Sequence, residues 1–232
     1  MKLSTLAFAA ALLMPAAASA QEILHFEGVK TAGGDKVGTA ATGAYQASRA
    51  PFNTKFDIYC VDYDHFATSV WTARELSFAD ATGANLLQAQ RQLGTEKSWG
   101  LAELRAAAWL STQFATNPVG LGAADDNWDT IHGAIWSMFS NNASVNQSAM
   151  LTMAASAVSA HGGEATWDDY ALLVDNQTFA ANYSNTMVLN QAFITHDPGT
   201  TIRVVPEPAT YAMMGFGLLS LGFVRRRKAL KA

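Results

Sequence analysis

Alternating hydrophobic and polar positions indicate strands towards both ends of the central part of the chain. Residues 23–26 and 55–61 fit strands, and in the second run Phe56, Ile58 and Cys60 fall on one face. Two later runs are also predicted to be strands: residues 187–195 and residues 201–205. The pattern therefore predicts strands before and after the middle of the chain.

Helical periodicity fills that middle. The predicted helices are residues 84–93, residues 99–114, a helix beginning at Asp126 or Asn127, residues 148–160, and residues 166–174. The last of these begins with Thr166, whose spacing to Asp169 fits a capping box with carboxylates near the positive end of the helix. The order of strands, helices and strands favours a single α+β domain, with its first and last strands in one sheet.

Residues 1–20 have the features of a secretory signal peptide. Lys2 supplies a positive start, residues 6–14 form an apolar run, and Ala18, Ser19 and Ala20 fit a cleavage site for signal peptidase. The apolar run is too short to cross a hydrocarbon layer about 30 Å thick. We therefore predict export by the Sec machinery, with cleavage after Ala20.

The C-terminus has three features in a fixed order. Residues 206–208 are Pro206, Glu207 and Pro208, residues 209–224 carry no charge, and a basic end follows with Arg225, Arg226 and Arg227. The two prolines favour an extended backbone around the glutamate. Helical residues 209–224 would extend about 24 Å, and snorkelling arginines lengthen that reach, so the segment can span a membrane. Because basic residues stay on the cytoplasmic side, the preceding chain is predicted to lie outside.

This arrangement resembles the PEP-CTERM sorting signal of Gram-negative bacteria. The resemblance implies that an integral-membrane exosortase cleaves near Pro206, Glu207 and Pro208. The body would be anchored transiently and would then reach the cell surface or the extracellular matrix, where such proteins are associated with exopolysaccharide and biofilm. The predicted parts are a signal peptide (1–20), an extracytoplasmic α+β domain (21–204) and a sorting signal (205–232). The last part comprises the motif (205–208), a transmembrane helix (209–224) and the basic end (225–232).

Charge is distributed unevenly over these parts. The whole chain has a formal net charge of −4, but residues 21–224 contain nine basic and all 19 acidic residues, which gives −10. Binding to nucleic acid needs clustered lysine and arginine, so a nucleic-acid partner is excluded. A single cysteine also excludes an intrachain disulfide and a cysteine-rich zinc site.

A second resemblance covers residues 50–140. Residues 56–62, 107–110 and 131–136 are similar in spacing to the thioester domains of bacterial surface adhesins. In that family a cysteine, here Cys60, condenses with a glutamine, and the resulting bond acylates a nucleophile on a surface. The position of that glutamine is His132, which has no carboxamide, so we expect a thioester-domain-like body without the bond. Gln113 is the nearest alternative glutamine in the sequence.

Two other interpretations of Cys60 and His132 are open. The pair could act as nucleophile and base of a cysteine hydrolase, oriented by Asp62 or Asp64. Alternatively, Cys60 is a small buried residue on a strand and His132 packs in the core beside tryptophans on its own helix. We favour the second interpretation and expect no enzyme activity and no cofactor.

Acidic clusters and tryptophans complete the candidates. The acidic clusters are residues 62–65, 125–129 and 168–169, and none has the spacing of an EF-hand. We expect no metal site; the alternative is a calcium site built from two of these clusters. Five of the six tryptophans lie between Trp71 and Trp136, and aromatic faces suit sugar rings, although tryptophans at helical spacing commonly pack in the core. We therefore expect an exported protein that binds exopolysaccharide non-covalently, and the net charge favours a neutral or cationic glycan.

Overall fold

The computed structural model describes residues 21–30, 36–52, 54–94, 97–116, 127–184 and 187–196. The predicted signal peptide, the predicted strand at 201–205 and the predicted sorting signal lie outside these ranges. No helix in the described ranges combines the length and the apolar character needed to cross a membrane.

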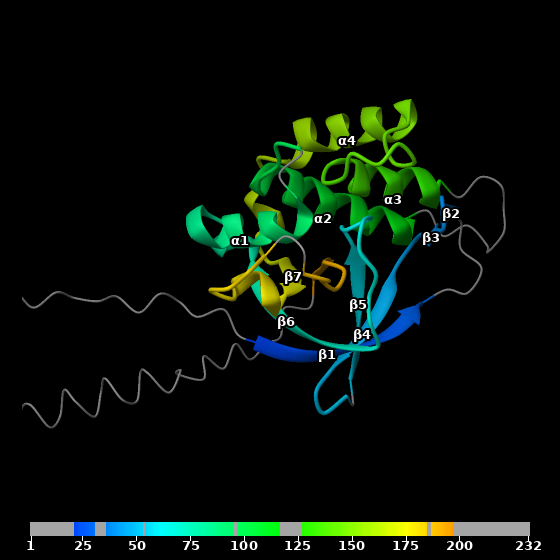
Figure 1. Cartoon of the computed structure of the whole chain (residues 1–232). Coiled ribbons are helices and arrows are strands. Elements are labelled where there is room, and N and C mark those ends of the chain that lie inside the picture. The colour runs from blue at the N-terminus through cyan, green and yellow to red at the C-terminus, as the bar shows by residue number, and fades with distance from the viewer. Residues whose placement is uncertain are drawn as a thin grey trace, which may run out of the picture. The chain divides into compact units, whose positions relative to one another are not determined.

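Six strands close into an antiparallel barrel, seen below the helices in Figure 1. Around the barrel the strand order is β1-β4-β5-β8-β7-β6, so strands from before and after the helices share one sheet. The strands are β1 (Gln21–Val29), β4 (Tyr45–Arg49), β5 (Lys55–Cys60), β6 (Val70–Ser77), β7 (Ala171–Asp175) and β8 (Phe193–Thr195). A separate two-stranded sheet comprises β2 (Lys36–Val37) and β3 (Ala40–Ala41).

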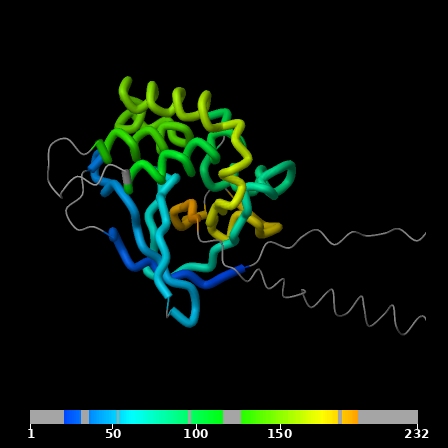
Figure 2. The backbone as a smooth tube through the Cα atoms, turned by 180° about the vertical axis from the view of Figure 1, so that it is seen from behind, coloured from blue at the N-terminus to red at the C-terminus, as the bar shows by residue number. Residues whose placement is uncertain are grey.

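Four helices connect β6 to β7. They are α1 (Gly83–Leu93), α2 (Leu101–Thr116), α3 (Trp128–Ser137) and α4 (Ser148–His161). Helices α2, α3 and α4 pack against one another, and Figures 1 and 2 show α4 farthest from the barrel, with α2 and α3 between. Three short 3₁₀ helices also occur: η1 (Phe78–Asp80), η2 (Ala165–Trp167) and η3 (Asn176–Phe179).

Two hydrophobic cores follow from the alternation along the strands. Phe56, Ile58 and Cys60 of β5 point into the barrel, where they meet Leu173 and Phe193. The intervening residues of β7 and β8 point out of the barrel towards the helices; they include Leu172, Val174 and Ile194. Because successive side chains of a strand alternate between faces, one strand can serve both cores.

The prediction of a helix over residues 166–174 is wrong. The structure has η2 at Ala165–Trp167 and then strand β7 at Ala171–Asp175. All five residues of β7 are buried, because one face lines the barrel and the other lies under the helices. A strand buried on both faces reads as a continuous apolar run, which periodicity alone cannot distinguish from a buried helix.

The other predicted elements in the described ranges are close to those observed, except that the strand predicted at 187–195 forms only at its end, as β8. Strands β2, β3, β4 and β6 were not predicted. The predicted helices at 84–93, 99–114 and 148–160 correspond to α1, α2 and α4. Helix α3 begins after Asn127 as predicted, but Asn127 is in the left-handed region (φ 53°) and makes no side-chain capping bond.

Candidate functional site

Strand β5 and helix α3 bring Cys60 and His132 together in the core. Both side chains are fully buried (0% exposed). The backbone N–H of Gly43 donates to His132 Nδ1 (3.0 Å), so Nε2 carries the proton and donates to the backbone carbonyl of Cys60 (2.9 Å). Both ring nitrogens are therefore bound to backbone groups, and in this geometry neither is directed at the Cys60 thiol.

Burial also suppresses the basicity of this histidine. It lowers the pKa of His132 to about 3, although the hydrogen bond to the Cys60 carbonyl favours the protonated form. Trp136, one turn along the same helix, stacks on the imidazole with 3.9 Å between ring centroids. A neutral, stacked imidazole fixed by two backbone groups is typical of a structural histidine.

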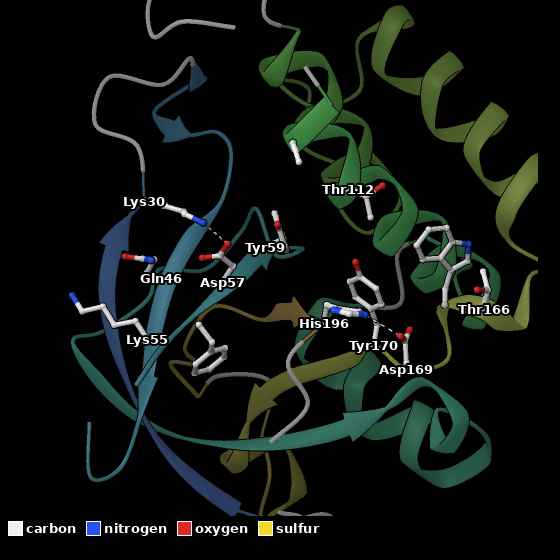
Figure 3. Close-up of a pocket in the computed structure, with 13 residues that line it drawn as sticks. Lys30, Gln46, Lys55, Asp57, Tyr59, Thr112, Thr166, Asp169, Tyr170 and His196 are labelled. Carbon is white, nitrogen blue, oxygen red and sulfur yellow. Dashed lines mark hydrogen bonds and ion pairs between the residues drawn. The ribbon is translucent and has the colours of Figure 1, made fainter. Parts of the chain in front are cut away.

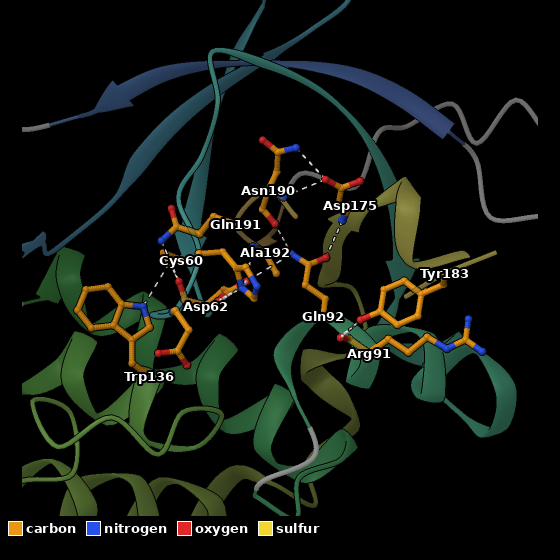
Figure 4. Close-up of polar contacts among 12 residues, drawn as sticks. Cys60, Asp62, Arg91, Gln92, Trp136, Asp175, Tyr183, Asn190, Gln191 and Ala192 are labelled. Atoms are coloured by element: carbon orange, nitrogen blue, oxygen red, sulfur yellow. Dashed lines mark hydrogen bonds and ion pairs between the residues drawn. The ribbon is translucent and has the colours of Figure 1, made fainter. Parts of the chain in front are cut away.

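The Cys60 thiol has its own set of partners, shown in Figure 4. It donates to the backbone carbonyl of Asp62 (3.1 Å) and accepts from the indole N–H of Trp136 (3.2 Å). The side chain of Gln191, which precedes β8, donates to the same Asp62 carbonyl (2.8 Å). Burial raises the pKa of Cys60, and the Asp62 carboxylate raises it further. The thiol therefore stays protonated at neutral pH, whereas a cysteine nucleophile requires the thiolate.

Asp62 does not orient His132. Its buried carboxylate accepts from His65 Nδ1 (2.9 Å), from Gln92 Nε2 (3.4 Å) and from backbone N–H groups, one of them that of Ala192 (3.3 Å). Gln92 in turn accepts from the backbone of Asp175 (2.7 Å), so a polar network joins the loop after β5 to α1 and β7 (Figure 4). The hydrogen bond to Asp62 raises the pKa of His65. The contacts of this aspartate are those of a structural residue.

The acidic clusters of the sequence have separate partners. Asp168 forms a bidentate pair with Arg105 (2.8 Å to each oxygen), and Asp169 pairs with His196 (2.9 Å). Asp129 accepts from the backbone N–H of Thr130 (2.5 Å), while residues 125 and 126 lie outside the described ranges. In the part of the chain that the structure describes, no three His, Cys, Asp or Glu side chains are grouped so that they could hold a metal ion.

A groove of about 860 Å³ lies on the outer surface of the barrel (Figure 3). Its first wall is the outward face of β4 and β5. Gln46 of β4 and Asp57 of β5 are directly opposite each other in the strand register, and Lys55 and Tyr59 lie on the same face of β5 as Asp57. These residues point outward because their neighbours in sequence point into the barrel. Lys30, just after β1, extends this wall.

The second wall of the groove comes from helix α2, from η2 and from the segment that leads into β7. It presents Thr112, Thr166, Asp169 and Tyr170, which Figure 3 labels. Trp167 also lines this wall. His196, which follows β8, closes the groove between the two walls. The groove therefore joins segments that are distant in the sequence.

Several contacts hold the aromatic rings of the groove in place. Tyr59 stacks on Phe114 of α2 with 5.8 Å between centroids and an interplanar angle of 4°. The Trp167 indole donates to Glu164 (2.8 Å) and meets the Tyr170 ring edge-on at 6.1 Å. Burial, followed by the charge of Asp57, raises the pKa of Tyr59 to about 12, so its hydroxyl stays protonated and can donate a hydrogen bond. The rings are thus largely preorganised.

The structure places the six tryptophans in three kinds of surroundings. Four of them are buried in the cores: Trp71, Trp99, Trp128 and Trp136. Trp109 is partly buried and stacks on His161 at 4.1 Å. Only Trp167 lines the groove, and it is the one that lies outside the sequence cluster between Trp71 and Trp136.

Comparison with known proteins identifies the C-terminus. A family model described as the PEP-CTERM protein-sorting motif matches residues 204–228. The chain carries a PEP-CTERM sorting motif. The match contains Pro206, Glu207 and Pro208 and confirms the predicted sorting signal. It supports an exported protein that an exosortase processes at the membrane, and it implies the exosortase as a partner. No curated protein and no solved structure matches the chain, and the resemblance of residues 50–140 to thioester domains is not confirmed.

Two features of the body, the position of Gln191 and the groove, were not evident from the sequence. Gln191, rather than Gln113, is the glutamine that shares a hydrogen-bond acceptor, the Asp62 carbonyl, with Cys60, and the side chain of Gln113 donates instead to Thr112 (3.0 Å). No local motif marks the groove, because its residues alternate with core residues or lie in short loops. The alternation along β5 indicates which of its residues point outward, but only the strand register shows that Gln46 of β4 lies beside Asp57.

Proposed function

We propose that the body of this exported protein binds an extracellular polysaccharide non-covalently in the groove of Figure 3. The observation that carries the proposal is the combination of held aromatic rings with hydroxyl and amide side chains in one open groove. Its volume is within the range of about 300–1,000 Å³ that is usual for ligand sites. The sorting motif supports the same proposal, because it directs the body to the place where matrix polymers are found.

Sugar rings match the chemistry of the groove. A pyranose has a face of C–H groups that packs on an aromatic ring, and its hydroxyl groups both donate and accept hydrogen bonds. Trp167 and Tyr59 provide aromatic surface, while Gln46, Thr112 and Thr166 provide polar groups. Because Glu164 fixes the indole of Trp167, little side-chain entropy is lost on binding.

Replacing the tryptophan tests this proposal. We expect Trp167→Ala to lower co-sedimentation of the exported protein with the producing organism's extracellular polysaccharide at least tenfold, a loss of about 1.4 kcal/mol. Phe66→Ala is the matched control, because Phe66 is 82% exposed and does not line the groove. Unchanged co-sedimentation of the Trp167 variant, at unchanged thermal stability, would contradict a role for the groove.

The route to the matrix is part of the proposal. Signal peptidase removes residues 1–20 after Ala20, and the Sec machinery carries the chain across the inner membrane of a Gram-negative bacterium. Residues 209–224 then hold the chain in the membrane, with Arg225, Arg226 and Arg227 on the cytoplasmic side, until the exosortase releases domain 21–204. Glu207→Ala should leave unprocessed precursor in the membrane fraction; normal processing of this variant would argue against recognition of the glutamate.

A second candidate function, that of a covalent adhesin, has one observation in its favour. The Gln191 carboxamide donates to the Asp62 carbonyl that also accepts from the Cys60 thiol, although the family position of the glutamine is His132. Condensation would join Sγ to the Gln191 side-chain carbon, break its C–N bond and release ammonia with the thiol proton. Intact-mass measurement of the exported protein decides between the two: a mass lower by one ammonia, restored in Gln191→Glu, would indicate the thioester, and the full mass would exclude it.

A further inference from the structure

We infer that the groove selects an uncharged polysaccharide, because each lysine, aspartate and histidine side chain that lines it in the described structure is already held by a partner side chain. This inference rests on the proposed function and adds the class of polymer to it. The sequence alone left neutral and cationic glycans open, and the arrangement of charges distinguishes them.

The ion pairs lie along the length of the groove. Lys30 forms an ion pair with Asp57 (2.5 Å), and Lys55 forms one with Glu27 on β1 (3.0 Å). His196 Nε2 is 2.9 Å from the Asp169 carboxylate, a hydrogen bond that becomes an ion pair when the imidazole is protonated. Apart from Glu27, these residues are the lysine, aspartate and histidine side chains that line the groove. In the described structure the groove therefore offers a ligand no charged side chain without a partner, although the body as a whole is acidic.

A charged polymer would have to break these pairs. An anionic sugar that takes Lys30 leaves Asp57 without its cation, and a cationic sugar that takes Asp57 leaves Lys30 without its anion. An exposed pair is weak, at about 0–1 kcal/mol, but the freed partner would then repel the same ligand. The net charge of −10 on residues 21–224 adds long-range repulsion of anionic polymers.

An uncharged hydroxyl can use the same pairs intact. In each pair the ammonium has donors and the carboxylate has lone pairs that the partner does not occupy. A sugar hydroxyl can therefore accept from Lys30 and donate to Asp57 at the same time, without any change in their separation. Gln46, opposite Asp57 on β4, adds an amide with one acceptor and two donors. Paired charges thus serve as a neutral hydrogen-bonding surface.

Binding to three defined polymers tests the selection. The exported protein is titrated with a soluble neutral glucan, an anionic polyuronate and cationic chitosan, at low and at high salt. We expect the glucan to bind best, with an affinity that changes by less than about twofold between the salts, because no net charge is neutralised. A tenfold preference for either charged polymer would overturn the inference and leave the proposed function standing. Binding to none of the three, and none to the matrix polysaccharide, would overturn both.

Breaking one ion pair provides a second measurement. In Asp57→Asn the unpaired Lys30 should raise the affinity for polyuronate at least fivefold, and in Lys30→Met the unpaired Asp57 should do the same for chitosan. Asp80→Asn and Lys36→Met are the matched controls, because both residues are exposed and neither lines the groove. Equal gains in the groove variants and in their controls would show that net charge, rather than pairing in the groove, sets the preference and would overturn the inference.

Discussion

Tyr59 and Cys60 are adjacent in strand β5, yet they belong to two regions of opposite character. Tyr59 points out of the barrel into the groove, and Cys60 points inward to His132 and Trp136. The inner region has the residue types of a catalytic pair, but its polar atoms are bound to one another and to the backbone. The groove was marked by no motif in the sequence, but its polar groups face solvent. The side of the strand on which a residue lies is therefore more informative about function than its type.

The two regions also differ in what their polar groups contribute. In the core, His132 links Gly43 to Cys60 and so connects helix α3 to two strand regions of the barrel. Buried polar networks of this kind rigidify a fold when every member is satisfied, and they are costly when one member is lost. In the groove, removing one polar group should change the stability of the fold little, because water can take over its hydrogen bonds. Substitutions should therefore affect stability in one region and affinity in the other.

The largest expected effect is that of His132→Leu. The substitution leaves the Gly43 N–H and the Cys60 carbonyl buried without partners, and each such group costs about 1–3 kcal/mol. We expect the free energy of unfolding to fall by roughly 3–5 kcal/mol in denaturant titrations. The affinity of the remaining folded protein for glucan should be unchanged. A loss of affinity at full stability would mean that the core histidine belongs to the functional site after all.

A smaller effect is expected from pH. His132 in the unfolded chain takes up a proton near its ordinary pKa of about 6.5, whereas the folded chain does so only near the lowered pKa of about 3. Between these values the unfolded state binds more protons, so stability should fall as the pH falls, by up to about 1.4 kcal/mol per pH unit from this residue. Urea unfolding between pH 6.5 and pH 4 measures the slope, and in His132→Leu the slope should be shallower by one proton. Equal slopes would show that His132 is not neutral in the fold.

Local patterns predicted much of this fold. Helical periodicity located α1, α2 and α4, and alternation on β5 placed Phe56, Ile58 and Cys60 inside. The prediction failed at β7, where burial on both faces removes alternation. It also missed β4 and β6, and in β6 the charged residues Arg74 and Glu75 interrupt the apolar pattern. Closure of the barrel depends on pairing between β1 and β6 and between β5 and β8, which no local pattern contains.

The candidate site was harder to predict than the fold, for a related reason. Spacing grouped Cys60 with His132 correctly in space, but it gave no sign that His132 Nε2 would bind the carbonyl of Cys60 instead of its thiol. The groove needs a register that sets Gln46 opposite Asp57, and a chain path that returns His196 beside Tyr170. Such long-range contacts are set by topology, whereas the sorting motif is contiguous and was recognised from the sequence.

The smallest expected effect is that of Tyr59→Phe. This substitution removes one hydroxyl from the groove and should change affinity without changing stability. The ring keeps its stacking on Phe114, and among the described residues no protein group is bonded to the Tyr59 hydroxyl, so stability should change by less than about 0.5 kcal/mol. Loss of one hydrogen bond to a sugar should lower the affinity for glucan about two- to tenfold. Tyr183→Phe is the matched control: its hydroxyl donates to the backbone of Arg91 (2.7 Å) away from the groove, so it should lose some stability and keep its affinity. If both variants bind glucan as the wild type does, Tyr59 contributes its ring alone, and the hydrogen bonds of the site come from Gln46 and the ion pairs.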